Sequence, residues 1–314
     1  MDKTKLSALK YLTPVDLVVI TTYFLLSVTH ILYHQVITGW YEYVFYNLLA
    51  ILLIWMIAFF DKNLKHPIWI HLHKWYLVLF VLLTFKQIYF MVDPIRNFVI
   101  DDFLIKLDYT IFGFHPTREL YNIANPYLTE LLQIVYSTFF FLPVILGLDL
   151  LKHKKMEAFN YTAFMIVYGF MLSFIGYFLF PAIGPRFTLH QFESTNLELP
   201  GIFLTNFLRD IINTAEGIPA GTLHPASVVQ RDVFPSGHTQ MTIITMIYAV
   251  KFKSNTKWFL LPVGILLIFS TVYLRYHYFV DLLGGVLFMF LTIISGKYIY
   301  KSWVNFRGSK FSAP

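Results

Sequence analysis

The stretch LRYHYFVDLLGGVLFMFLTIISGKY, residues 274–298, decides the fold class. From position 279 to 299 the chain carries only two charged side chains, Asp281 near the start and Lys297 near the end. A helix needs about 20 mostly apolar residues to cross the hydrocarbon core of a bilayer. The stretch therefore predicts a membrane-spanning helix that has a cluster of polar side chains at one boundary.

The composition of the whole chain agrees with a membrane location. Of 314 residues, 57% are apolar and only 13% are charged, whereas soluble domains carry about 25% charged residues. The sequence has no cysteine, which excludes disulfides, thiolate nucleophiles and cysteine-ligated metals. No cleavable signal is expected, because the first apolar run is too long for a signal core and lacks a small-residue cleavage site.

Seven further apolar runs predict an all-α integral membrane protein with about eight transmembrane helices. The expected helices cover residues 14–33, 43–60, 75–92, 127–150, 158–180, 237–252, 257–274 and 279–299. Lysine and arginine concentrate in the two tails and in the connections after the second, fourth and sixth helices. Because short cytoplasmic loops are rich in these cations, both termini are expected to be cytoplasmic.

Three segments then face the outside, at residues 93–126, 181–236 and 275–278. The first contains FVIDDFLIKLDYTIFGF, residues 98–114, in which apolar residues alternate with acids. This pattern suits a helix that lies at the membrane interface. The second segment is long and rich in proline and glycine, and loops of that length are usually functional or disordered.

The motif FPSGHT, residues 234–239, directly precedes the sixth expected helix. Pro235 and Ser236 suit a helix start, and Gly237 would let a ligand approach the backbone closely. The free N–H groups of the first turn would form an anion site, in which His238 can give or take a proton. A capped helix with an interfacial histidine is the alternative interpretation.

His277 and Asp281 lie four residues apart at the same expected boundary, so on a helix they would be stacked neighbours. A carboxylate beside one imidazole nitrogen fixes the tautomer and leaves the other nitrogen as a nucleophile or base. Arg186 and Arg275 also lie at this boundary, and a guanidinium offers a planar fork of donors that matches phosphate. Either arginine could instead anchor a helix end at the lipid head groups.

Together these side chains predict phosphoryl transfer at the extracytoplasmic face, with no metal and no cofactor. His277 would attack phosphorus, Asp281 would orient His277, and His238 would protonate the departing alkoxide. Water as the second acceptor would make the protein a phosphatase, and another alcohol would make it a transferase. The expected phosphate-binding residues are Arg186, Ser236, Gly237 and Arg275.

The two motifs resemble the signature of the type 2 phosphatidic acid phosphatase superfamily, membrane enzymes built on a core of six helices. In that family a PSGH motif supplies phosphate contacts and the acid histidine, and a later histidine with aspartate four residues on supplies the nucleophile. Ser236, Gly237 and His238 match the first motif, and His277 and Asp281 match the second. The resemblance implies that two transmembrane helices, within residues 1–74, precede a six-helix catalytic domain of residues 75–314 with outer loops 93–126 and 181–236.

The sequence departs from the family pattern at two positions. Leu179 stands where the family has a lysine seven residues before Arg186, and Ser270 and Thr271 replace a serine–arginine pair. The stretch TVYLRYHYFVDLLGG, residues 271–285, is similar instead to inositol phosphorylceramide synthases, which also lack that arginine. Gly237 stands where those synthases have leucine.

The expected function is that of a lipid phosphotransferase similar to inositol phosphorylceramide synthases, which move a phosphoinositol head group from a glycerolipid to a ceramide. One alternative is a phosphatase that acts on phosphatidic acid, phosphatidylglycerol phosphate or a polyprenyl diphosphate. An alternative of another class is a lipid transporter or scramblase. The expected partners are a lipid phosphate, a lipid alcohol in the transferase case, and membrane lipids, with no nucleic acid and no obligate protein partner.

Several other polar residues have simpler interpretations. Lys86 and Glu130 are expected to pair with each other inside the membrane boundary, although Lys86 could also replace the missing phosphate lysine. The charges of the long outer segment could contact a head group, but they are expected to be solvated loop charges, and the cytoplasmic histidines are expected to be interfacial. These residues are Arg209, Asp210, Arg231, Asp232, His66, His71 and His73.

Overall fold

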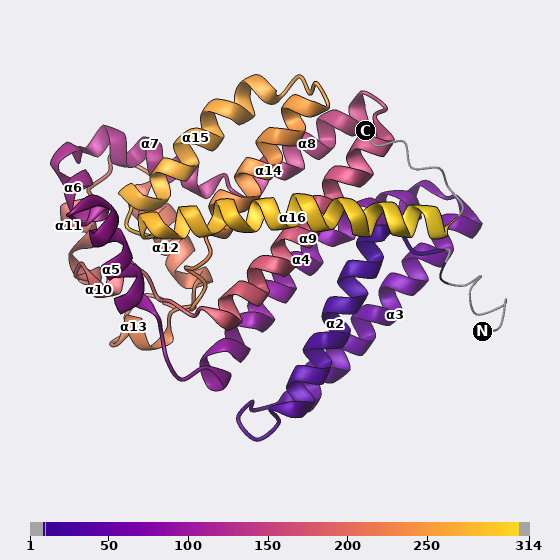
Figure 1. Cartoon of the computed structure of the whole chain (residues 1–314), viewed down its shortest axis with the longest axis horizontal. Coiled ribbons are helices and arrows are strands. Elements are labelled where there is room, and N and C mark those ends of the chain that lie inside the picture. The colour runs from indigo at the N-terminus through magenta and orange to yellow at the C-terminus, as the bar shows by residue number, and fades with distance from the viewer. Residues whose placement is uncertain (1–8, 10, 308–314) are drawn as a thin grey trace. The chain divides into compact units, whose positions relative to one another are not determined.

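The computed structural model describes residues 9 and 11–307. Within these residues the chain forms helices and connecting segments and no strand (Figure 1). The chain divides into two compact units. The first contains the residues up to Asn97, Ala163–Met171 and the residues from Thr292 onward, and the second contains Phe98–Thr162 and Leu172–Leu291.

Five helices of the described chain are long and apolar enough to cross a membrane. Two shorter helices, bent by 56° at the break between them, are together long and apolar enough to form a sixth span. This result confirms an all-α, multi-pass membrane protein. The five helices are α2 (Pro14–Leu32), α3 (Trp40–Leu64), α4 (Pro67–Ile95), α9 (Met156–Leu179) and α16 (Phe279–Phe306), and the bent pair is α7 (Pro126–Ser137) with α8 (Phe141–Lys152).

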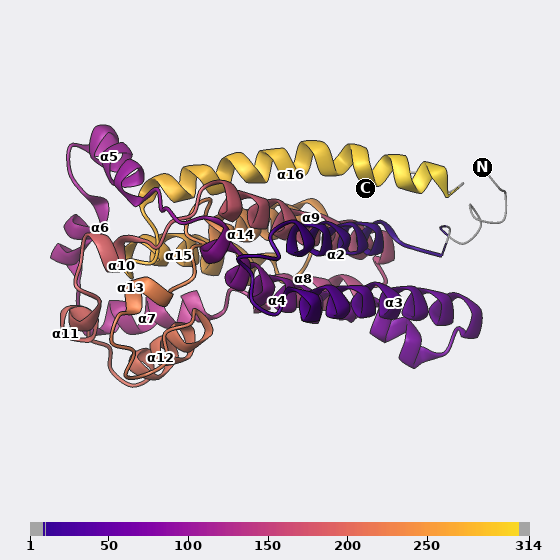
Figure 2. The same ribbon diagram turned by 90° about the horizontal axis from the view of Figure 1, so that it is seen from below.

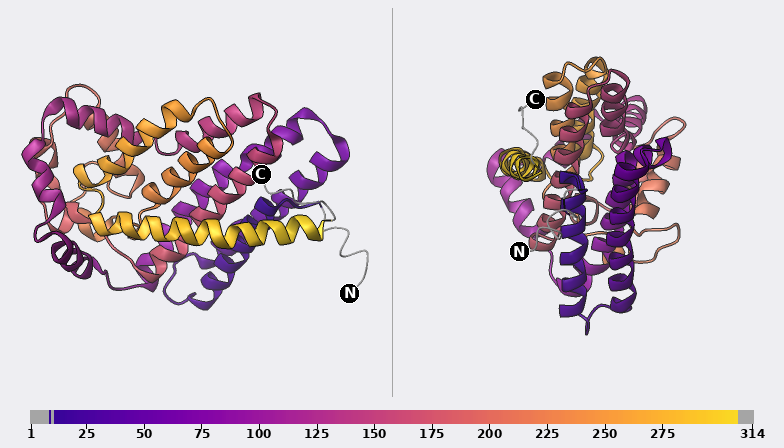
Figure 3. Two further views of the ribbon diagram at one scale, coloured as in Figure 1. Left: turned by 45° about the horizontal axis from the view of Figure 1, so that its top comes forward. Right: turned by 90° about the vertical axis from the view of Figure 1, so that its right-hand side faces the viewer.

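The two remaining expected spans are also helical but short. They are α14 (Gly237–Lys251), with 15 residues, and α15 (Lys257–Tyr273), with 17 residues. A straight span needs about 20 residues, so both helices fall short of that length. In the second unit α14 packs against α15 and α8, and α15 packs against α7 (Figures 1 and 3).

Polar side chains join the helices of the first unit, in which α2 packs on α3 and α3 on α4. The Asp16 carboxylate caps the start of α2 and also bonds the ring of His73, at 2.9 Å, and the hydroxyl of Tyr76. The other nitrogen of His73 lies 2.6 Å from Asp61. His73 therefore connects three helices, a more specific place than the interfacial one expected from sequence.

The two longer segments expected to face outward, residues 93–126 and 181–236, contain short helices (Figure 2). The predicted interfacial helix is present as α5 (Asp101–Phe112), which begins with two acids and ends at Gly113 in the left-handed region. The other short helices are α6 (Pro116–Glu119), η1 (Leu120–Ile123), α10 (Pro185–Thr188), η2 (Phe192–Ser194), α11 (Thr195–Glu198), α12 (Thr205–Ala215) and α13 (Pro225–Val228).

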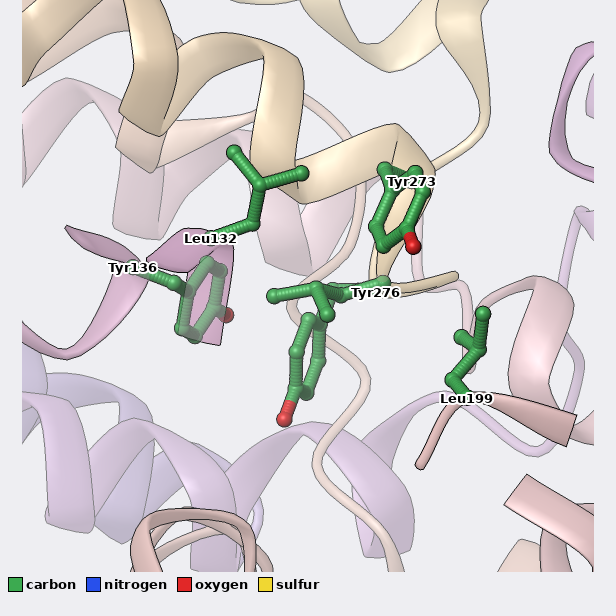
Figure 4. Close-up of a cluster of buried hydrophobic side chains, with 6 residues drawn as sticks. Leu132, Tyr136, Leu199, Tyr273 and Tyr276 are labelled. Atoms are coloured by element: carbon green, nitrogen blue, oxygen red, sulfur yellow. The ribbon is translucent and has the colours of Figure 1, made fainter. Parts of the chain in front are cut away.

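A buried aromatic and aliphatic cluster in the second unit supports the segment that carries His277 (Figure 4). The rings of Tyr136 and Tyr276 stack in this cluster with centroids 4.2 Å apart and planes within 10° of parallel. Large aromatic side chains bury much apolar area in one place. The cluster consists of Leu132, Tyr136, Leu199, Tyr273, Leu274 and Tyr276.

Candidate active site

His277 and Asp281 form the pair that their spacing predicts. His277 lies in the segment between α15 and α16, and Asp281 lies in the first turn of α16. The Nδ1 atom of His277 is 3.3 Å from Oδ2 of Asp281, which also accepts the backbone N–H of Tyr278 at 2.7 Å. Asp281 is completely buried. Because Nδ1 faces the carboxylate, the Nε2 atom is the one left for chemistry.

His238 contacts the Nε2 atom of His277. Its Nδ1 atom lies 3.4 Å from Nε2 of His277, although the two histidines are 39 residues apart in the sequence. The His238 ring packs on the rings of Tyr136 and Phe139, at centroid distances of 4.6 and 4.2 Å. The aromatic contacts fix the plane of the imidazole, so the structure brings the two predicted catalytic histidines together.

Backbone contacts hold the two motifs against each other. The N–H of Ser236 donates to the carbonyl of Asp281 at 3.0 Å. A Cβ at Gly285 would lie 2.6 Å from the Ser236 carbonyl oxygen, and a Cβ at Gly284 would lie 2.6 Å from the ring of Phe234. The glycine pair therefore lets α16 approach the loop before α14 more closely than any other residues would.

Ser236 begins α14 as its sequence predicts. Its hydroxyl accepts the backbone N–H of Thr239 at 3.2 Å, which is the geometry of an N-cap. A Cβ at Gly237 would lie 2.6 Å from the hydroxyl of Tyr177, so a protein group occupies the space that the sequence analysis reserved for a ligand. Contact of Ser236 and Gly237 with phosphate stays a prediction.

Arg186 lies beside the histidine pair, in the short helix α10. Its Nη1 donates to the side-chain oxygen of Asn213 at 3.0 Å, its Nη2 pairs with Glu216, and its guanidinium covers the ring of Tyr276 at 4.3 Å. Burial opposes the charge of Arg186, but Glu216 and Tyr276 outweigh this effect and raise the pKa of the guanidinium. Among the described residues, the buried Nε of Arg186 has no hydrogen-bond partner.

Arg275 lies in the same segment as His277 but faces other residues. It pairs with Glu198 and lies 5.6 Å from the ring of Tyr121, with only 2% of its surface exposed. Its backbone is in the left-handed region, at φ 68°, a conformation that costs a non-glycine residue about 1 kcal/mol or more. The buried Nε of Arg275 also has no hydrogen-bond partner among the described residues, but Arg186 is the arginine whose charge acts on His277.

Arg209 is the main error of the sequence interpretation, which treated it as a solvated loop charge. The structure places Arg209 in α12 with 5% of its surface exposed. It donates to the side chain of Asn196 at 2.5 Å and to the carbonyl of Leu199 at 3.2 Å. Burial, together with nearby Arg186 and Arg275, lowers the pKa of Arg209, so three arginines lie close to the segment before His277.

Two carboxylates of α5 that the sequence analysis did not single out hold the segments that carry Arg186 and His277. Asp101 accepts the N–H groups of Ile183 and Gly184, at 3.0 and 2.8 Å, and the hydroxyl of Tyr278 at 2.8 Å. Asp108 accepts the N–H groups of Phe279 and Val280, at 2.9 and 2.8 Å. The two acids are seven residues apart and so share a face of α5, which is the one signal that could have revealed them.

Glu130 binds backbone groups within its own unit, and its pairing with Lys86 stays a prediction. Its carboxylate accepts four consecutive backbone N–H groups of residues 202–205, at 2.6 to 3.2 Å, and the hydroxyl of Thr205 at 2.7 Å. Lys86 has its ammonium 5.2 Å from the ring centroid of Tyr89. Glu130 therefore fixes the loop before α12.

Burial lowers the pKa of His277 well below its ordinary value, and His238 adds to this effect. His277 is therefore neutral near pH 7, with a lone pair available on Nε2. A neutral imidazole held by a carboxylate, with a second imidazole in contact and a buried guanidinium nearby, can attack an electrophilic centre and pass a proton to a leaving group.

Comparisons with known proteins identify the family of the chain. The family model described as "PAP2 superfamily" matches residues 104–295. The chain belongs to this superfamily. It is 25% identical over 199 residues to a PA-phosphatase related-family protein of Dictyostelium discoideum, an alignment that covers 56% of the chain and 34% of that relative. The chain thus spans about a third of the relative's length. No solved structure matches the chain.

Proposed function

We propose that this protein is a membrane lipid phosphotransferase that works through a phosphohistidine at His277. The observation that carries the proposal is the contact between Nε2 of His277 and Nδ1 of His238, at 3.4 Å, with Asp281 on the far side of the nucleophile. This geometry puts a nucleophile and a proton donor side by side. The two rings are in contact, so they would have to move apart to admit a phosphorus and its leaving oxygen.

The proposed reaction has two steps. First, Nε2 of His277 bonds to phosphorus, the bond from phosphorus to the alkoxide breaks, and His238 gives its proton to that alkoxide. The negative charge of a bound phosphate favours the protonated form of His238 beforehand. Second, an acceptor hydroxyl gives its proton to His238 and attacks phosphorus, and the bond to His277 breaks.

The side chains around the histidines have distinct tasks. Asp281 orients His277 and stabilises the charge that the ring acquires. The unpartnered Nε of Arg186 is available for a phosphate oxygen, and removing one such donor typically costs about 3 kcal/mol in the barrier. Asp101 and Asp108 are positioning residues, because they contact the segments that carry Arg186 and His277 and not the reacting atoms.

The transferase branch is favoured by two positions. Leu179 and Thr271 stand where the phosphatases of the family have a lysine and an arginine, and the stretch 271–285 is similar to inositol phosphorylceramide synthases. The carbonyl of Thr271 instead accepts the N–H groups of Tyr276 and His277, so this position shapes the turn. The positive-inside pattern supports an extracytoplasmic site with both termini cytoplasmic.

A lipid phosphate phosphatase is the second candidate, and the name of the Dictyostelium relative, a PA-phosphatase related-family protein, favours it. A transporter or scramblase would use the same basic site without cleaving a bond. The polar residues gather at one end of the helices instead of near the midplane, where transporters commonly place their sites. This arrangement favours catalysis.

The test uses purified protein in detergent with EDTA present and His277→Ala as the control. Phosphatidic acid is supplied alone, and phosphatidylinositol is supplied with ceramide or diacylglycerol. A new lipid that carries the head group, formed by the wild type only, supports the transferase. Release of inorganic phosphate from phosphatidic acid alone makes the protein a phosphatase, and equal turnover by His277→Ala overturns the covalent scheme.

A further inference from the structure

The helix α12 and the loop before it expose an apolar stripe that consists of Phe203, Phe207 and Ile211. Phe207 and Ile211 are four positions apart and therefore share one face of the helix, and Phe203 lies in the preceding loop. Phe203, Phe207 and Ile211 are 87%, 62% and 51% exposed. An exposed apolar patch commonly marks a surface that binds a membrane or another protein, so the stripe requires a cover.

The other sides of α12 differ from the stripe. Thr205 and Arg209 are buried, and Ile212 packs against the buried cluster that contains Tyr276. A polar edge of exposed side chains completes the helix and consists of Asn206, Asp210 and Thr214. One side of α12 thus faces the protein, one is apolar and one is polar, as in helices that lie in the plane of a membrane interface.

The neighbouring helix α7 also has an exposed apolar face. Tyr127, Leu131 and Ile134 are exposed, and with Glu130 they follow the i, i+3, i+4, i+7 spacing of one helix face. Together α7 and α8 are long and apolar enough to cross a membrane. α12 packs against α7 (Figure 2), so the apolar stripe lies beside a helix that is itself part of a span.

Glu130 attaches the start of the α12 segment to this face of α7. Its carboxylate accepts the N–H groups of residues 202–205 and the hydroxyl of Thr205. A charge and free backbone N–H groups are both costly at membrane depth, and here each satisfies the other. Ile202, Phe203 and Leu204 are exposed at this attachment, and their N–H groups need no water.

We infer that α12 lies in the plane of the membrane interface, with Phe203, Phe207 and Ile211 inserted among the lipid chains beside α7. Lipid is the cover that fits, because the stripe continues the exposed apolar face of a span. The polar edge contains no lysine or arginine. Insertion therefore depends on apolar contact, and a zwitterionic lipid surface is sufficient.

This position brings the lipid surface to the candidate active site. The side-chain oxygen of Asn213, on α12, accepts Nη1 of Arg186 at 3.0 Å, and Glu216, which directly follows α12, pairs with Arg186. A helix held at the interface would hold Arg186 near the depth at which lipid phosphates lie. The placement of α12 does not require that the site cleaves a phosphate ester, so its test is independent of turnover.

The test uses the full chain in phosphatidylcholine vesicles. Because the sequence has no cysteine, one introduced cysteine can be labelled selectively with a nitroxide. Electron paramagnetic resonance then measures collisions of the label with oxygen, which concentrates in lipid, and with a water-soluble nickel chelate. The stripe variants are Phe203→Cys, Phe207→Cys and Ile211→Cys, the matched controls on the polar edge are Asn206→Cys, Asp210→Cys and Thr214→Cys, and Leu131→Cys reports on α7.

We expect the stripe labels to collide mainly with oxygen, at a depth of roughly 5–10 Å in the interface, and the polar-edge labels to collide mainly with the nickel chelate. Only variants that elute from size exclusion like the wild type are compared. Stripe labels that collide mainly with the nickel chelate, while the label at position 131 collides with oxygen, would place α12 in water and overturn the inference. Stripe labels shielded from both reagents would show that protein covers the stripe, which also overturns it.

Discussion

Replacing Asp108 with alanine removes the acceptor for two backbone N–H groups at the start of α16. These groups belong to Phe279 and Val280 and lie 2.9 and 2.8 Å from the carboxylate. Hydrogen bonds to a charged group are each worth about 1.5–3 kcal/mol. A negative charge at a helix N-terminus adds about 0.3–1 kcal/mol.

For the ionised carboxylate, burial outweighs these contributions, because the pKa of Asp108 is raised. The loss in Asp108→Ala comes from the two N–H groups that it leaves without an acceptor, at about 1–3 kcal/mol each. We therefore expect Asp108→Ala to lower the free energy of unfolding by about 3 kcal/mol. Asp108→Asn keeps one of the two acceptors, so it should lie between the wild type and alanine. Asp102→Ala, at the exposed neighbouring position of the same helix, should change stability by less than about 0.5 kcal/mol.

The effect on catalysis follows from the same contacts. His277 is two residues before Phe279, so a shifted start of α16 moves His277 relative to His238. We expect kcat to fall at least about tenfold with little change in KM, because misplacing a reacting group by about 1 Å can cost up to about a hundredfold. Steady-state kinetics and thermal unfolding in detergent measure both effects. Wild-type kcat and unfolding temperature in Asp108→Ala would refute the positioning role.

Three further changes should have distinct outcomes. Arg186→Lys should lower kcat by about a hundredfold, or about 3 kcal/mol in the barrier, whereas Arg275→Lys should lower it less; equal losses would show that both arginines contact phosphate. Glu130→Gln should speed proteolysis of residues 202–205 by weakening five hydrogen bonds, and an unchanged cleavage rate would contradict this. Burial lowers the pKa of His190 to about 4, so protonation of this ring favours the unfolded chain. The unfolding temperature should therefore fall as the pH drops from about 6.5 to 4, and His190→Gln should reduce this fall.

Apolar runs were sufficient to predict most of the helices, because a membrane span requires about 20 consecutive apolar residues and can therefore be recognised in a short stretch of sequence. The prediction of one helix over residues 127–150 missed the break between α7 and α8 at residues 138–140. Pro143 explains the break, since proline lacks an N–H and its ring clashes with the carbonyl four residues earlier, that of Phe139. The mean hydropathy of the run does not reveal this break, because a single proline changes the average very little.

The contact between His277 and Asp281 was predictable for the same reason. His277 and Asp281 meet through a spacing of four residues, which a single helix turn converts into contact. His238 could be expected nearby only through the inferred topology, and the structure supplies the 3.4 Å contact.

The supporting residues could not be predicted, because their partners are distant in the sequence. Asp101 bonds Tyr278 across 177 positions, and Asp108 bonds Phe279 across 171. Arg209 likewise resembles an ordinary loop charge until α12 folds against the chain around Asn196 and Leu199. Burial of a charged side chain depends on tertiary packing, which short-range patterns do not encode.

Direct detection of a covalent intermediate on His277 tests the central claim most directly. Wild-type protein is mixed with phosphatidic acid or phosphatidylinositol labelled with ³²P, stopped in alkaline detergent, and digested for mass spectrometry. Our account predicts a phosphorus adduct on the peptide that contains His277, formed as fast as turnover and absent from His277→Ala. Turnover of either lipid without such an adduct, or an adduct that persists in His277→Ala, would contradict the account.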